Sequence, residues 1–523
     1  MPGKQAVLSI YADPASENVD DRLFQIGVPN LPTAGSHEQF ILFKEWLRVC
    51  ESHKHVTKTN DTRADDRPTR VIDVGNSRIR LINGKDMVSS EYIALSHRWG
   101  DKPEHHLGRT LRGNHISRYS EINWDELPQN FQGAIKITRG LDLQYLWIDS
   151  ICIIQEDPED WSRESVRMEQ VYSDAKCVLA ASSSDSSIEG FLERPTTSRP
   201  FVTLRSGPSD VAYVCKNIDN FRGDVDEAIL NTRGWTLQER ALARRTIHFT
   251  KNQTYFECSD GIQCESLTRL TNGRSSLLGD SDFPTSVVSR YKDGRVVLVQ
   301  TLYHQYSKRN FSKSQDRPIA ISGLEKRLTS AFTTRGGYGV FQNFLERTLL
   351  WKRDDETRSL EPIQFPPVRN VPTWSWMAYD GVISYVHVDF DKVDWTKEYS
   401  SPFDSGSGAQ GKWHWEADGT NRPPILGLSR VRELDSKRDS HELLKRIIFD
   451  TPGPEQRPQD LRCVVIGKAK PGDSTGHVIL NCYVLVVKAS SDENLRGAYI
   501  RVGAGELMED EIIWDRYEAG NLH

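Results

Sequence analysis

One region of the chain repeats the same pattern of apolar and polar positions. Short apolar runs of strand length occur within 91–101, at 144–148 and at 176–182. The segments between them, 127–143 and 157–175, instead carry apolar residues three or four positions apart, which is the spacing of an amphipathic helix. The order strand, helix, strand, helix, strand predicts a parallel sheet with crossover helices on its faces, and therefore an α/β fold.

Both predicted helices carry end signals. Gly140 is placed to stop the first helix, because glycine readily adopts the conformation that follows a helix end. Asp157 and Pro158 suit the N-cap and the first helical position of the second helix. One face of this second helix is predicted to pack inward, through Trp161, Ser165, Met168 and Tyr172.

The remaining segments suggest a four-part organisation. Residues 70–82 are predicted as two short strands around a turn, and residues 232–258 as a helix followed by a hairpin. Helical patterns then prevail, and β-rich segments replace them further along. The predicted parts are an N-terminal extension (1–69), an α/β domain (70–290), a helical segment (291–370) and a β-rich region packed on the α/β domain (371–523).

Composition and charge narrow the functional classes. Of the 523 residues, 37% are hydrophobic and 27% charged, as in a globular protein with a sizeable core. The net charge of −6 gives no electrostatic basis for binding nucleic acid, and no window approaches the roughly 18 apolar residues of a membrane span. The eight cysteines include no CxxC pair and the start lacks a secretory pattern. We therefore expect a cytoplasmic protein with reduced thiols and no metal site.

Asp149 stands out because it lies in an otherwise apolar segment, 145–154. Burying an aspartate costs several kcal/mol unless the carboxylate is paired or reaches a polar cavity. In open parallel sheets, ligands bind beyond the carboxyl ends of the strands. We therefore expect Asp149 at the exit of its strand, beside the loop that follows Ser96, where it would line a crevice at the edge of the sheet.

Three blocks of the chain resemble the fungal heterokaryon incompatibility (HET) domain. They are YIALSHRWGD (92–101), YLWIDSICIIQED (145–157) and RGWTLQERALARRTIHF (233–249). Later segments such as TWSWMAYDG (373–381) are also similar to full-length relatives. Relatives commonly carry an aromatic residue in place of His97 and often a cysteine in place of Arg98. The resemblance implies a cytosolic fungal protein of non-self recognition and programmed cell death.

The HET domain is in turn remotely similar to TIR domains, which implies a TIR-like parallel-sheet fold here. Some TIR domains cleave NAD with a glutamate on a helix after a central strand. This similarity makes NAD a candidate substrate and Glu164 the corresponding acid. The catalytic candidates are thus Glu164 and Asp149. The ligand-binding candidates are Ser96, His97, Arg98, Trp99, Trp235, Gln238, Glu239 and Arg240.

Structural roles are the alternative for the residues at the predicted sheet edge. The Ser96 hydroxyl could cap the turn that follows its strand. Asp149 could cap the turn after it, paired with Arg98 or Arg240. Arg98, which could hold a phosphate or carboxylate through two parallel hydrogen bonds, could equally pair with Asp101.

The helical candidates have similar alternatives. Glu164 could be a solvent-facing acid paired with Arg167 at i+3. Glu239 and the arginine after it could belong to a buried network that holds the third block on the sheet. Cys152 is more simply a buried, inert thiol than a nucleophile, because no activating histidine is placed beside it in the sequence.

Three functions follow from these observations. The first is a HET-type cell-death protein with a crevice that binds or cleaves NAD, and with a protein partner or self-association. The second is an enzyme of small-molecule metabolism that uses the same crevice for another ligand. The third is an interaction module without chemistry. The sequence has no P-loop, GxGxxG, GxSxG or HExxH motif, so it offers no familiar mechanism to choose between them.

Overall fold

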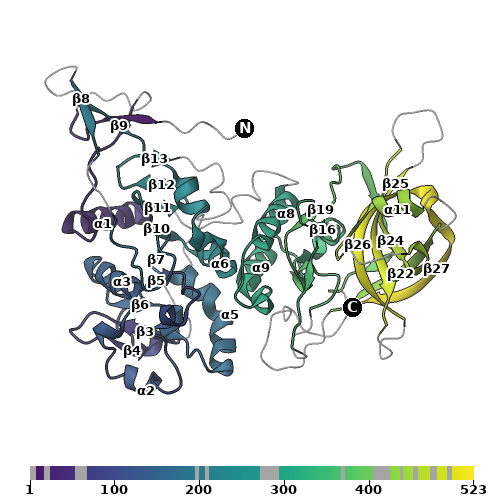
Figure 1. Ribbon diagram of the computed structural model, residues 1–523, viewed down its shortest axis with the longest axis horizontal. Coiled ribbons are helices and arrows are strands. Elements are labelled where there is room, and N and C mark those ends of the chain that lie inside the picture. Colours follow the sequence, from purple (N-terminus) through teal and green to yellow (C-terminus); the bar gives the residue numbers. More distant parts are fainter. Residues whose placement is uncertain are drawn as a thin grey trace. The chain divides into compact units, whose positions relative to one another are not determined.

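The computed structural model comprises two compact units, unit 1 (Met1–Ser286) and unit 2 (Val287–His523) (Figure 1). Each unit has its own sheet and helices, and all eight cysteines are buried and form no disulfide. The structure describes residues 7–16, 24–52, 67–194, 199–205, 211–270, 294–357, 359–366, 371–403, 424–435, 440–451, 457–471, 480–491 and 497–523.

Unit 1 is built on one mixed sheet. Four central strands, in the order β6-β5-β7-β10, pair in parallel, while the strands on both flanks pair antiparallel. The sheet is therefore not parallel throughout. In sheet order the strands are β13 (Arg269–Leu270), β12 (Gly261–Cys264), β11 (Thr254–Cys258), β10 (Arg245–Phe249), β7 (Cys177–Ala180), β5 (Ile93–Ser96), β6 (Tyr145–Trp147), β3 (Arg70–Asp73) and β4 (Arg80–Asn83).

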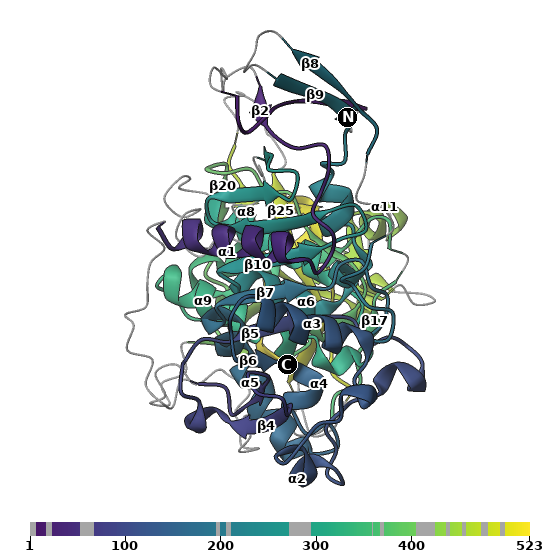
Figure 2. The ribbon, with the colours of Figure 1, turned by 90° about the vertical axis from the view of Figure 1, so that its left-hand side faces the viewer.

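Helices cover both faces of this sheet, which confirms the α/β prediction. One face carries α1 (His37–Ser52) packed on α3 (Gln129–Gly140), and the other carries α5 (Pro158–Asp174) packed on α6 (Gly234–Leu242) (Figures 1 and 2). The chain leaves β5 for β6 on one side and then crosses to β7 on the other side. Such a reversal creates the kind of edge at which α/β proteins bind ligands.

The predicted helix ends are confirmed. The first crossover helix ends at Gly140, as predicted, but Gly140 is its last helical residue, and the left-handed conformation after the helix is adopted by Asp142, at φ 59°. Asp157 is the N-cap of α5, and its side chain accepts hydrogen bonds from the backbone N–H groups of Glu159 and Asp160 at 3.1 and 3.2 Å. Two shorter helices, α2 (His115–Arg118) and α4 (Asp149–Cys152), lie in the connections on either side of β6.

A second, four-stranded sheet joins early and later parts of unit 1. Strand β1 (Leu8–Ala12) pairs antiparallel with β9 (Val211–Lys216), so the start of the chain adds a strand to a hairpin that follows β7. The outer strands of this sheet are β2 (Gln25–Ile26) and β8 (Phe201–Arg205) (Figure 2).

Unit 2 begins with helices and continues as a β-rich region. Its helices are α8 (Gly294–Ser307), α9 (Ile319–Ala331), α10 (Leu345–Leu349) and α11 (Ser440–Lys445). Short paired strands follow or separate them: β14 (Gly336–Gly337), β15 (Val340–Phe341), β16 (Trp351–Arg353), β17 (Glu361–Pro362), β18 (Tyr379–Asp380), β19 (Ile383–Tyr385) and β23 (Ile447–Phe449).

The main sheet of unit 2 has a ring of strand pairings, because β22 pairs with both β27 and β24. Alternate residues of β24 belong to two different hydrophobic clusters. Cys463 and Val465 pack in one cluster, and Val464 and Ile466 pack in the other. Both faces of this strand are therefore buried. The strands are β20 (Val393–Trp395), β24 (Arg462–Ala469), β25 (Asn481–Ala489), β26 (Ala498–Met508), β27 (Ile512–Leu522), β22 (Leu426–Leu434) and β21 (Tyr399–Ser400).

A buried ion pair ties the parts of unit 2 together. The Arg501 Nε of β26 lies 3.0 Å from Asp450 Oδ2, and neither side chain is exposed to solvent. The same guanidinium stacks on the ring of Trp351, with its central carbon 3.3 Å from the ring centroid. It also donates to the carbonyls of Leu349, at 2.7 Å, and Trp351. The charge is thus shared by three segments that are distant in sequence.

No helix in the described part of the chain combines the length and the apolar character that a membrane crossing needs.

Candidate functional site

The carboxyl ends of β5 and β6 bring Asp149 and the loop after Ser96 together. Asp149 is the first residue of α4, directly after β6. Its Oδ2 accepts a hydrogen bond from Trp99 Nε1 at 3.0 Å, and its Oδ1 accepts one from the backbone N–H of Ser150 at 2.7 Å. The Asp149 side chain remains 20% exposed, so this acid is hydrogen-bonded and still reaches solvent.

The prediction that Asp149 pairs with Arg98 or Arg240 is wrong. Arg98 pairs instead with Asp101, with 2.7 Å between Nη2 and Oδ2, and Arg240 pairs with Glu257 and Asp226. The structure therefore places Arg98 in a local pair over three residues, which is one of its two predicted roles. Asp149 does accept one hydrogen bond from the turn that follows it, from the backbone N–H of Ser150, although the N-cap residue of α4 is Ile148.

His97 lies beneath this edge, with a side chain only 1% exposed. Its Nδ1 is 3.8 Å from Asp149 Oδ1, and its ring packs edge-on against Phe131 at 5.1 Å between centroids. Burial lowers the pKa of His97 to about 4, because the charged form is poorly solvated; Asp149 opposes this effect and Arg233 reinforces it. The ring is therefore neutral at pH 7 and packs much as an aromatic side chain would.

His97→Phe is expected to make unit 1 less sensitive to acid. The ordinary pKa of the ring is 6.5 and the folded one about 4, so between these values the unfolded chain binds a proton that the folded chain does not. Stability is thus fully present above pH 6.5 and falls as the pH drops toward 4. Across this pH range the free energy of unfolding falls by roughly 3 kcal/mol.

Urea unfolding at pH 7.5 and at pH 4.5 measures this difference. The loss on acidification should be smaller in His97→Phe than in the wild type, while His37→Gln, at an exposed histidine, should behave like the wild type. An unchanged loss in His97→Phe would contradict the assigned burial.

Ser96 links the first sequence block to the third. Its hydroxyl donates to Glu239 of α6, and both residues are buried. Gln238, which precedes Glu239 in the sequence, is also buried. Trp235 is half-buried, and its ring meets that of Trp161 edge-on with 6.4 Å between the ring centroids. These contacts hold α6 against β5 and α5.

Arg240 forms the buried network that the third block suggested, but with partners that sequence reasoning missed. Its Nε and Nη2 bond both oxygens of Glu257 on β11, at 2.9 and 2.8 Å, and its Nη1 bonds Asp226 at 2.8 Å. His248 Nε2 lies 2.8 Å from the same Glu257. Although burial alone would raise the pKa of Glu257, Arg240 and His248 lower it to about 2. Glu257 could have been found in the sequence by the same signal as Asp149, because it too is an acidic residue inside a mostly apolar segment, here the buried strand β11.

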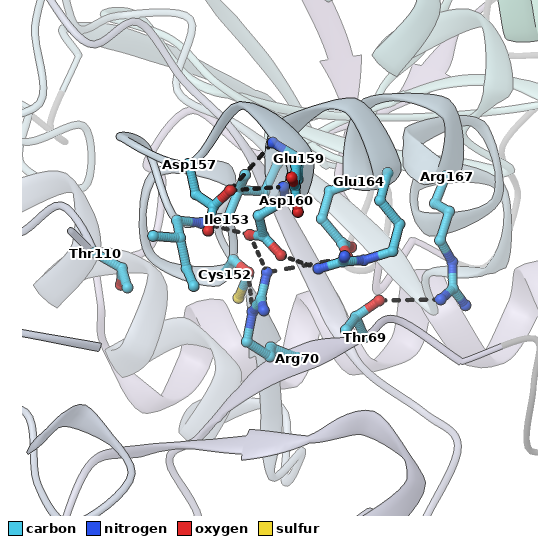
Figure 3. Close-up of polar contacts among 12 residues, drawn as sticks. Thr69, Arg70, Thr110, Cys152, Ile153, Asp157, Glu159, Asp160, Glu164 and Arg167 are labelled. Carbon is cyan, nitrogen blue, oxygen red and sulfur yellow. Dashed lines mark hydrogen bonds and ion pairs between the residues drawn. The ribbon is translucent and has the colours of Figure 1, made fainter. Parts of the chain in front are cut away.

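Glu164 lies in a different polar cluster on α5 (Figure 3). Its side chain is only 3% exposed, with Oε1 at 3.2 Å from Arg163 Nε and 4.0 Å from Arg70 Nη2. Asp160, one turn earlier, accepts hydrogen bonds from both arginines and from the backbone N–H of Ile154, the last at 2.8 Å. The carboxylate of Glu164 is thus covered by the side chain of Arg163, which is itself 54% exposed.

The solvent-facing alternative for Glu164 is therefore wrong. Its expected partner, Arg167, donates instead to Thr69 Oγ1 at 3.0 Å (Figure 3). Arg167 also donates to the Arg67 carbonyl at 2.7 Å. Arg70 was not singled out by sequence reasoning, because a lone arginine at the start of a strand has no distinctive pattern.

The two predicted catalytic acids are not hydrogen-bonded to each other in the described part of the chain. Asp149 bonds Trp99 and Ser150, while Glu164 pairs with the two arginines around Asp160. Burial raises the pKa of Cys152 to about 12, as expected of an inert thiol. Within the described ranges, no three His, Cys, Asp or Glu side chains are grouped to hold a metal ion.

Comparison with known proteins bears on the same region. Residues 92–239 match the family model described as Heterokaryon incompatibility protein (HET). The match starts at the strand that delivers Ser96 and ends at Glu239, its hydrogen-bond partner. No curated protein and no solved structure matches the chain. Residues 92–239 of this chain are therefore a heterokaryon incompatibility (HET) domain.

Proposed function

We propose that this chain acts in fungal non-self recognition and programmed cell death, with unit 1 delivering the effect and unit 2 sensing or regulating. The family match to residues 92–239 supports this function in general terms. The observation that carries the proposal to a site is the meeting of Asp149 with Trp99 at the carboxyl ends of two parallel strands. Ligands of α/β proteins bind at such edges.

The chemistry proposed for this edge is the cleavage of NAD. The bond between ribose C1′ and the nicotinamide nitrogen breaks, and its electron pair leaves with nicotinamide. Water then adds to C1′ and releases a proton, giving ADP-ribose. A carboxylate favours the breaking of the C1′–nitrogen bond, because positive charge develops on the ribose in that step.

The two acids would have different roles in this reaction. Asp149, 20% exposed, is the acid that incoming ribose hydroxyls reach, so it serves binding. Glu164 is the acid assigned to stabilise the ribosyl cation, and it can do so only after the side chain of Arg163 has moved aside. Asp149→Asn should therefore raise KM, whereas Glu164→Gln should lower kcat by about 10²–10³-fold.

The test is nicotinamide release from NAD by the purified full-length protein, followed by chromatography. Glu159→Gln, at an exposed acid on the same helix, is the matched control and should retain wild-type release. Circular dichroism of each variant separates loss of activity from loss of fold. Failure of the wild type to release nicotinamide would remove this reaction, and full activity of folded Glu164→Gln would remove the role of Glu164.

The biological part of the proposal has its own test. Expression of the full chain in a fungal host should slow growth or kill the cells. Healthy growth at a confirmed level of expression would count against a cell-death function, whatever the outcome with NAD.

A further inference from the structure

A small cavity lies between the main sheet of unit 1 and helix α6. Its volume is about 10 Å³, close to the smallest space that holds one water molecule. All of its lining residues are buried. They are Ser96, Val178, Ala180, Leu230, Asn231, Thr236, Arg240, Thr246 and His248.

Three polar atoms of the lining side chains have no hydrogen-bond partner within the described part of the chain. They are Thr236 Oγ1, Thr246 Oγ1 and His248 Nδ1, on side chains that are at most 3% exposed. A buried polar atom without a partner is costly, and native proteins rarely retain one. Three of them around a single cavity indicate a shared polar partner.

The hydrogen on His248 can be placed from its other contact. Glu257 is ionised, since its pKa is lowered to about 2 by Arg240 and His248, so its oxygens only accept hydrogen bonds. His248 Nε2, 2.8 Å away, must therefore donate. Burial also lowers the pKa of His248 and keeps the ring neutral, which leaves Nδ1 as a bare acceptor. The partner in the cavity must donate to Nδ1.

The threonines and Ser96 complete the requirement. Thr236 and Thr246 carry hydroxyls that donate or accept, and the Ser96 hydroxyl, which already donates to Glu239, retains acceptor capacity. Arg240 is already paired with the carboxylates of Glu257 and Asp226 and does not call for an anion. A small neutral molecule that both donates and accepts fits every atom.

We propose that this cavity binds one ordered water molecule, which donates to His248 Nδ1 and bonds the hydroxyls of Thr236 and Thr246. The water joins β10 to α6 beside the bond between Ser96 and Glu239. It is thus a fixed component of the packing within the third sequence block, next to Ser96 of the first block, and this assignment does not depend on NAD chemistry.

A crystal structure of the full-length protein at better than about 2 Å resolution tests the proposal directly. The expected result is a density peak within hydrogen-bond distance of His248 Nδ1 and at least one threonine hydroxyl. A cavity without density at that position would overturn the proposal.

The sign of one substitution provides a second test. Thr246→Val keeps the shape of the side chain and removes its hydroxyl. If water is bound, the water loses a partner and the melting temperature should fall by about 2–4 °C. If the cavity is dry, the change removes an unpaired hydroxyl and the melting temperature should rise, which would refute the bound water.

Thr138→Val is the reference for this comparison. Thr138 is fully buried, and its hydroxyl donates to the Ala134 carbonyl at 2.8 Å. Its replacement therefore reports the usual cost of removing a buried threonine hydroxyl that has a partner. Thr246→Val should shift the melting temperature in the same direction as this reference.

Discussion

Arg240→Met is expected to lower the free energy of unfolding of unit 1 by about 3–5 kcal/mol. The guanidinium is only 5% exposed and bonds both oxygens of Glu257, whose side chain is completely buried. Removing it leaves a buried carboxylate with His248 as its remaining polar contact of this network. The cost comes from the uncompensated charge, because methionine fills much of the same space.

Thermal unfolding with hydrogen exchange on unit 1 peptides measures the effect, which corresponds to a drop of roughly 10 °C. Adding Glu257→Gln to Arg240→Met removes the stranded charge and should recover part of the loss. Glu227→Gln, which breaks an exposed pair with Arg222, is the matched control and should leave the midpoint unchanged. If Arg240→Met melted like this control, the network would not carry the stability assigned to it.

Asp450→Asn is expected to destabilise unit 2 to a similar extent, about 3–5 kcal/mol. Neither Asp450 nor Arg501 is exposed, and an arginine cannot lose its proton to escape the unfavourable environment. The carbonyls of Leu349 and Trp351 and the Trp351 ring still contact the guanidinium, so the unit should remain folded at low temperature.

Hydrogen exchange on peptides of unit 2 shows whether the loss lies there. The control is Glu442→Gln, which breaks an exposed pair with Lys445 on α11. A loss no greater than that of the control would show that the carbonyl and ring contacts of Arg501 suffice without Asp450.

The order of elements in unit 1 was predictable because its signals are local. Apolar runs and helical spacing indicated β5, α3, β6, α5 and β7, and end signals indicated where α3 ends and where α5 begins. A cap forms within one turn of the chain, so Asp157 finds the N–H groups of its own helix whatever the rest of the molecule does. The three blocks also sufficed to indicate the HET family, which the match to residues 92–239 confirms.

The position of Asp149 was predictable for a related reason. Its strand and the following turn are consecutive in sequence, and the carboxyl edge of a parallel sheet is set by strand order alone. The environment of Glu164, by contrast, was not predictable from the sequence. Helical spacing placed it on the flank of a packed face, but Arg70, on a strand some ninety residues earlier, covers that flank (Figure 3).

The sequence by itself determined the α/β class, the helix and strand order of the HET domain, and the delivery of Asp149 to the edge of the sheet. Only the tertiary structure decided which charges meet. The chain has 67 basic and 73 acidic residues, so any one arginine has many chemically equivalent partners. The choices of Glu257 for Arg240, Asp160 for Arg70 and Glu239 for Ser96 follow from which strands and helices pack together. The low pKa of Glu257 depends on the same packing, because burial and the distance to an opposite charge are properties of the folded chain.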